Sequence, residues 1–345
     1  MSVKKLSPGD LSSFLDDVAG KMNLVAPVKS GDSVRYAPAS GSEGVVLDYV
    51  LPDNSIKDVL FPADDPVYKY RWSVEAAEFE PIERTDEKTV VFGVRPCDLA
   101  AIDLLDQVFT GGDFDDVQYK NRRENTLMIG LGCLETDPSC ICRAFEVTPG
   151  SSRGADVMMY RDEDGYLAHA VTEKGQELLS SMPGTEVGGE DLEAARERSE
   201  ATEVPRAEGL SPQGLEDQLM GRWDSPYWEQ LSLRCLSCGT CTFVCPTCHC
   251  FMIADLSRGQ EGLRFKRWDS CQYKRFVLAA GDHNPRPTRK ERIRQRFMHK
   301  LVYFPETNDG FLCTGCGRCV ARCPVDIHIA GVVRDMKEVK ADAGS

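Results

Sequence analysis

Two runs of cysteine in this sequence share a spacing that is typical of iron–sulfur ligands. In each run the cysteines follow the pattern C-x2-C-x2-C-x3-C, and a proline stands directly after the fourth cysteine. The runs are Cys235, Cys238, Cys241 and Cys245, and then Cys313, Cys316, Cys319 and Cys323. One such run is also compatible with a zinc site, but two runs with their prolines in register favour two 4Fe–4S clusters.

The pattern also predicts which cysteines share a cluster. In the bacterial ferredoxin arrangement, the first three cysteines of a run bind one cluster and the fourth binds the other cluster. One cluster is therefore expected on Cys235, Cys238, Cys241 and Cys323. The other cluster is expected on Cys313, Cys316, Cys319 and Cys245.

A strand–helix–strand unit is predicted upstream of these runs. Residues 89–94 and 127–131 are short apolar segments typical of buried strands, and apolar residues at helical spacing lie between them. Such a unit has parallel strands, and open α/β sheets bind ligands beyond the carboxyl ends of their strands, where Cys97 and Cys133 stand. Asp98 is expected to cap the intervening helix, which would leave the Cys97 thiolate near the positive end of the helix dipole.

Two further cysteines follow within one loop, so four cysteines are expected at this edge of the sheet. They are Cys97, Cys133, Cys140 and Cys142. Their convergence predicts a third iron–sulfur cluster. The alternative is that they are scattered buried thiols, which are common in protein cores.

Three cysteines remain outside these sets. Cys248 and Cys250 flank His249 directly after the first run, and Cys271 follows Trp268-Asp269-Ser270. They could complete another metal site with a non-cysteine ligand, form a redox-active dithiol, or be buried thiols beside the first run. The residues alone leave these three interpretations open.

The N-terminal part of the chain, residues 1–181, is predicted to be an α/β domain with a mainly parallel sheet. It opens with an amphipathic helix, because Ser7 and Asp10 form a capping-box pattern ahead of an apolar stripe at helical spacing. It closes with a strand pair around residues 157–160 and 166–171, followed by a helix.

The rest of the chain is predicted to be a linker and a second domain. Residues 182–221 carry glycines, prolines and acidic runs, which are typical of a linker. Residues 222–335 are predicted to be a mostly α-helical, ferredoxin-like dicluster domain. The long spacer between the two cysteine runs is expected to form helices at residues 274–280 and 290–303.

Composition limits the class of protein. The chain has 345 residues, enough for two domains, and no apolar run in it is long enough to cross a membrane. Its first residues lack the apolar core of a signal peptide, so a cytoplasmic location is expected. The 15 cysteines, an odd number, favour metal ligation over a disulfide framework in that reducing compartment.

The charge balance argues against nucleic acid as a general partner, since the net charge is −14. The spacer reverses this balance, with twelve Lys or Arg between Arg264 and Lys300 against three acidic residues. A nucleic-acid surface is one interpretation, but no recognised binding motif accompanies it. A docking face for an acidic partner, together with charge compensation for anionic clusters, fits the pattern better.

The sequence contains none of the common nucleotide-binding or catalytic motifs. It has no Gly-x-Gly-x-x-Gly fingerprint opening a helix, no Walker loop, no nucleophile elbow and no zinc-binding HExxH. A chain with many cluster cysteines and no second chemical centre is predicted to relay electrons rather than to catalyse a reaction.

Several segments agree with the shared pattern of one family. They are residues 93–99, 140–142, 235–250, 267–271, 283–286, 299–300 and 313–319. Together they resemble the dicluster iron–sulfur subunits of sulfhydrogenases (the beta subunit) and of anaerobic sulfite reductase (the A subunit). They are also similar to subunits that accompany flavin oxidoreductases serving heterodisulfide reductase.

This resemblance implies an electron-transfer subunit of a hetero-oligomeric anaerobic complex. The subunit would pass electrons between a partner that binds FAD and NAD(P)H and a catalytic partner. That catalytic partner would be a hydrogenase, a sulfite or sulfur reductase, or a heterodisulfide reductase. The alternative is that the chain is itself a reductase, with a sulfur or disulfide substrate near Cys248, Cys250 and Cys271.

Overall fold

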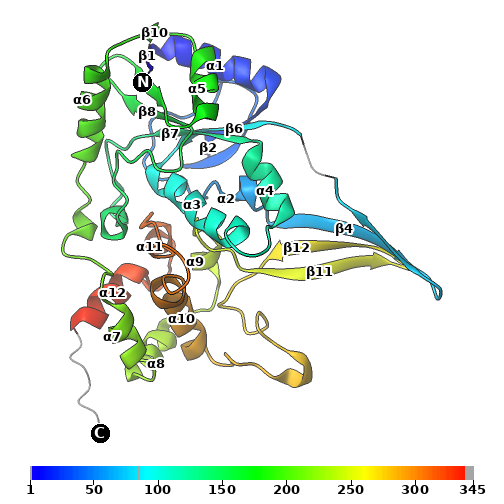
Figure 1. Ribbon diagram of the computed structural model, residues 1–345. Helices are drawn as coiled ribbons and strands as arrows, with labels where there is room; N and C mark the ends of the chain where they lie inside the picture. Colours follow the sequence, from blue (N-terminus) through cyan, green and yellow to red (C-terminus); the bar gives the residue numbers. More distant parts are fainter. Residues whose placement is uncertain (1, 84–85, 339–345) are drawn as a thin grey trace.

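The computed structural model describes residues 2–83 and 86–338, and it places their strands in two sheets (Figure 1). The larger sheet has the strand order β10 (Thr185–Glu186), β1 (Val3–Leu6), β9 (Tyr166–Ala170), β8 (Val157–Arg161), β7 (Thr126–Leu131), β6 (Thr89–Val94), β2 (Asn23–Ser30) and β3 (Ser33–Ala39). The helices around it are α1 (Pro8–Lys21), α2 (Lys57–Leu60), α3 (Pro96–Thr110), α4 (Val117–Glu124), α5 (Glu173–Ser181) and α6 (Gly189–Glu200).

Different helices cover the two faces of the large sheet. Along β6, Val90 and Phe92 pack on the side of α1 and α5, whereas Val91 and Val94 pack on the side of α3 and α4. Successive side chains of a strand point to opposite faces, so a strand buried on both faces must be apolar throughout. The predicted strand–helix–strand unit is confirmed, because β6 and β7 pair in parallel and α3 joins them.

The large sheet is mixed, so the expectation of a mainly parallel sheet holds only for its centre. There β2, β6, β7 and β8 pair in parallel. The outer strands β3, β9, β1 and β10 pair antiparallel. For β3 and β9 the reason is the short turn after β2 or β8, which forms a hairpin and cannot make a parallel crossover. The opening helix is confirmed as α1, which Ser7 and Asp10 cap, and the predicted strand pair is confirmed as β8 and β9.

A second sheet projects from the body of the molecule as an arm (Figure 1). Its strand order is β11 (Phe251–Arg258), β12 (Glu261–Trp268), β4 (Asp64–Trp72) and β5 (Ala77–Pro81). The sequence pattern did not predict these strands. Both faces of the arm carry exposed side chains, including apolar ones such as Phe79 and Leu256, so no buried face imposes an alternating pattern.

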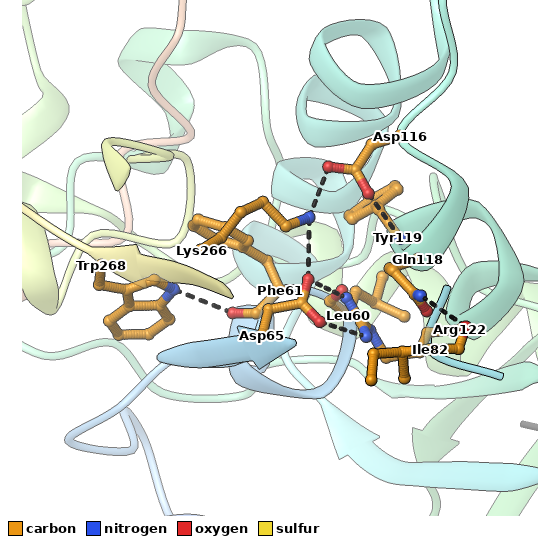
Figure 2. A network of polar contacts seen from close by, with 10 residues as sticks. All are labelled: Leu60, Phe61, Asp65, Ile82, Asp116, Gln118, Tyr119, Arg122, Lys266 and Trp268. Atoms are coloured by element: carbon orange, nitrogen blue, oxygen red, sulfur yellow. Dashed lines mark hydrogen bonds and ion pairs between the residues drawn. The ribbon is translucent and has the colours of Figure 1, made fainter. Parts of the chain in front are cut away.

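Buried charges fix the root of the arm (Figure 2). Asp65 on β4 accepts two hydrogen bonds from the guanidinium of Arg122, at 3.0 and 2.8 Å. Lys266 on β12 lies 2.8 Å from the same carboxylate and 2.6 Å from that of Asp116. Because Asp65 and Lys266 are both buried, each charge depends on these partners, and the network ties the arm to α4.

Short helices and loops surround the two cysteine runs. They are α7 (Glu216–Gly221), α8 (Pro226–Arg234), α9 (Thr240–Phe243), α10 (Arg289–Met298), a π-helical turn (His299–Tyr303), α11 (Arg318–Ala321) and α12 (Ile329–Glu338). Single 3-10 turns lie at Cys142–Phe145, Pro205–Ala207 and Ala280–Asp282. None of the helices in the described part of the chain is long and apolar enough to span a membrane.

The spacer between the runs is only partly helical. The helix predicted at residues 290–303 is confirmed as α10 and the π-helical turn. The helix predicted at residues 274–280 is wrong, since that segment forms turns. The spacer instead contributes the hairpin of β11 and β12, which closes at Gly259 (φ 62°) and gains pairing partners on β4. A mostly α-helical domain is therefore not confirmed.

Candidate metal centre

Twelve cysteines of the described chain line three cavities in three sets of four, and Cys316 of the second set also borders the third cavity. The first cavity is lined by Cys235, Cys238, Cys241 and Cys323. The second is lined by Cys245, Cys313, Cys316 and Cys319. The third is lined by Cys97, Cys133, Cys140 and Cys142.

The fourth cysteine of each run thus lies in the cavity of the other run, which is the exchange expected from the spacing. Each run turns at a glycine in the left-handed region, Gly239 (φ 77°) or Gly317 (φ 82°), and these glycines cap α9 and α11. The two short helices pack together. Each run therefore passes its fourth cysteine across to its neighbour.

The third cavity lies beyond the carboxyl ends of β6 and β7, where open α/β sheets bind ligands. Cys97 stands in the first turn of α3, because Pro96 begins that helix. The expectation that Asp98 caps α3 is wrong, since Arg95 occupies the N-cap position. Asp98 lies inside the first turn, where it is fully buried and paired with Arg318.

The three cavities form a continuous series. Gly315 and Cys316 line both the second and the third cavity, and Arg296 lines both the first and the second. The Ile141 N–H donates to the Gly315 carbonyl at 2.9 Å, and a Cβ at position 315 would collide with the Ile141 carbonyl oxygen. A side chain there would push the second and third cavities apart.

Buried donors without a protein partner line the first two cavities. Arg296 Nε, Ser237 Oγ and Thr314 Oγ1 are buried, and no group among the described residues satisfies them. Ser237 lines the first cavity, Thr314 lines the second, and Arg296 lines both. The sulfides and thiolates of iron–sulfur clusters accept such hydrogen bonds, so these residues fit 4Fe–4S clusters.

The thiols themselves also fit metal ligation. Burial raises the pKa of Cys241 and Cys140 to about 11, and it raises the pKa of Cys142 and Cys313 to about 12. Without a compensating positive charge these thiols stay protonated. Metal ions bind cysteine as the thiolate and supply that positive charge.

Buried cations complete the first two cavities. Lys300 is 3% exposed, and its ammonium donates to the Thr247 hydroxyl at 2.9 Å and to Cys245 Sγ at 3.4 Å. Arg296 is 4% exposed. Arg292, Arg296 and Lys300 stand four residues apart along one face of α10 and its π-helical extension, and this spacing is a signal that the sequence itself displays. Part of the basic spacer therefore lies inside the molecule.

The remaining three cysteines line none of these three cavities. The Cys248 thiol contacts Cys245, and the Cys250 and Cys271 thiols contact each other beside β11 and β12. Among the described residues, no group of three or more His, Cys, Asp or Glu side chains is gathered closely enough to hold a single metal ion.

Comparison with known proteins agrees with this geometry. The family model of the 4Fe-4S dicluster domain matches residues 234–327, which contain both cysteine runs. The sulfhydrogenase 2 subunit beta of Pyrococcus furiosus is 33% identical over 341 residues, which cover 98% of this chain and 99% of that protein. The similarity therefore includes the large sheet as well as the region of the two runs.

Proposed function

Because the chain belongs to the family of sulfhydrogenase beta subunits and contains a 4Fe-4S dicluster domain, we propose that it relays electrons within a hetero-oligomeric oxidoreductase complex. One partner would bind FAD and NAD(P)H, and the other would carry the catalytic site. That catalytic partner would be a hydrogenase, a sulfite or sulfur reductase, or a heterodisulfide reductase. The observation that carries the proposal is the continuous series of three cavities, which twelve cysteines line and of which the second and third share Cys316.

In this proposal the twelve cysteines of the three cavities hold three iron–sulfur clusters. A bound 4Fe–4S cluster supplies one-electron transfer at low potential. The protein supplies the charge around the clusters and their spacing. Arg296 and Lys300 bring positive charge to the first two cavities, and Gly315 allows the second and third to share a wall. Cys238 is exposed, so the first cavity lies close to the molecular surface at this residue.

Replacing Cys238 with alanine is expected to abolish electron flow between the flavin-containing and the catalytic partner, because the first cluster loses a ligand. The assay compares NAD(P)H-dependent activity of the assembled complex with dye reduction by the flavin-containing partner alone, which should persist. Leu233→Ala, a change at an exposed position on α8, is the matched control and should keep full coupled activity. Normal coupled activity in the Cys238 variant would rule out the relay.

Replacing Lys300 with methionine is expected to lower the reduction potential of the second cluster, because positive charge near a cluster favours its reduced state. The ammonium donates to Cys245 Sγ at 3.4 Å, and losing about 1.4 kcal/mol of that interaction corresponds to about 59 mV for one electron. EPR-monitored redox titration measures the shift. Lys274→Met, at an exposed position of the same spacer, should leave the potential unchanged. Equal potentials in the two variants would contradict a role for Lys300.

A further inference from the structure

Cys250 and Cys271 meet at the open end of the β11–β12 hairpin. Cys250 directly precedes β11, and Cys271 follows β12 after two intervening residues. The hairpin pairs Phe251 with Trp268, and the Asp269 N–H donates to the Cys250 carbonyl at 2.9 Å. Backbone pairing therefore holds the two cysteines close together.

Buried polar contacts fix the loop that carries Cys271. The Ser270 hydroxyl is fully buried, and it accepts hydrogen bonds from Thr242 Oγ1 at 2.8 Å and from the Gln272 N–H at 3.1 Å. The Gln272 side-chain amide donates to the Arg292 carbonyl at 2.9 Å and to Cys271 Sγ at 3.4 Å. The Cys271 sulfur is thus held in place beside Cys250.

The two thiols are chemically unequal. The Cys250 thiol donates a hydrogen bond to the Cys271 sulfur, and this bond, helped by Gln272, lowers the pKa of Cys271 to about 6 although burial opposes it. The same bond, together with burial, raises the pKa of Cys250. A thiolate nucleophile beside a protonated thiol is the arrangement that thiol–disulfide exchange requires.

We propose that Cys250 and Cys271 form a thiol–disulfide exchange site for a small disulfide substrate. The Cys271 thiolate attacks one sulfur of R–S–S–R, forming a mixed disulfide and releasing R–S⁻, which takes up a proton from water. Cys250 then loses its proton to water and attacks the Cys271 sulfur, releasing the second R–S⁻, which is protonated in turn. The dithiol is oxidised by two electrons to a Cys250–Cys271 disulfide, and the substrate is reduced to two R–SH.

This activity does not depend on the proposed relay, because the exchange needs only the two thiols and the disulfide. Neither cysteine lines the three cavities, so both stay free to react when clusters are bound. Both side chains are partly exposed. An external thiol such as dithiothreitol returns the pair to the dithiol for another cycle.

The test uses the whole, cluster-loaded chain and cystamine under anaerobic conditions. About two thiols should be released per chain. A disulfide should then join the tryptic peptides 235–258 and 268–274. In Cys250→Ser, about one thiol should be released and the mixed disulfide should remain trapped on Cys271, because no second thiol resolves it. In Cys271→Ser, neither product should form.

Iron per chain is measured in parallel and should be unchanged in both variants. The proposal fails if Cys271 stays unmodified in Cys250→Ser with iron retained, or if the adduct forms on a different cysteine. Loss of iron in either variant would mark that cysteine as a cluster ligand and would overturn the proposal as well. None of these results alters the outcome for Cys238→Ala, so the exchange site and the relay are tested independently of each other.

Discussion

Cys323→Ala is expected to remove the cluster from the first cavity and to leave the second cluster bound. In sequence Cys323 belongs with Cys313, Cys316 and Cys319, yet it lines the cavity of the other run. The cluster-loaded chain should carry about twelve irons, and the variant should lose about four of them. Iron and acid-labile sulfide per chain measure the loss. About eight irons in the unchanged chain would contradict a third cluster.

Paired substitutions identify the cysteines that share a cluster. Cys323→Ala combined with Cys238→Ala should lose no more iron than either change alone, because both remove ligands of one cluster. Cys323→Ala combined with Cys316→Ala should lose about eight irons, because two clusters are affected. The opposite outcome, additive loss for the first pair and shared loss for the second, would mean that each run binds its own cluster.

Local spacing explains what the sequence could predict. Cysteine ligands of one loop are fixed by chain geometry, so the pattern of Cys235 to Cys245 indicates its chemistry before any fold is known. The β6–α3–β7 unit was predictable for the same reason, since its strands are apolar throughout and its helix carries a periodic apolar face. The cap predicted for α3 at Asp98 was wrong. Pro96 begins α3 before Asp98, and Asp98 pairs across the fold instead.

Long-range pairing explains what the sequence could not predict. Strand β12 pairs with β4, where Gly262 faces Tyr70, and neither strand has a continuous buried face to reveal it. The shared wall of the second and third cavities likewise depends on Gly315 meeting Ile141, residues from different parts of the sequence. The spacing of the cysteines predicted which residues are metal ligands. It could not predict how the three cavities are arranged next to one another, because tertiary contacts set that arrangement.

Asp98→Asn is expected to destabilise the protein by about 3–5 kcal/mol, the cost of breaking a buried ion pair by neutralising one partner. Arg318 donates two hydrogen bonds of 2.7 Å to the Asp98 carboxylate, and the two side chains are 0% and 1% exposed. Asparagine keeps the shape but leaves the Arg318 guanidinium as an uncompensated buried charge. The anaerobic thermal unfolding midpoint, compared at equal iron content, measures the loss.

Two further variants separate the charge effect from packing. Asp53 pairs with Arg322 at the surface, where the Arg322 side chain is 48% exposed, so Asp53→Asn should cost only about 0–1 kcal/mol. The double variant Asp98→Leu with Arg318→Met removes both charges and should recover most of the stability lost in Asp98→Asn, since apolar residues often replace a buried pair without net cost. An Asp98→Asn variant as stable as Asp53→Asn, or a double variant less stable than Asp98→Asn, would contradict an uncompensated Arg318 charge as the cause of the lost stability.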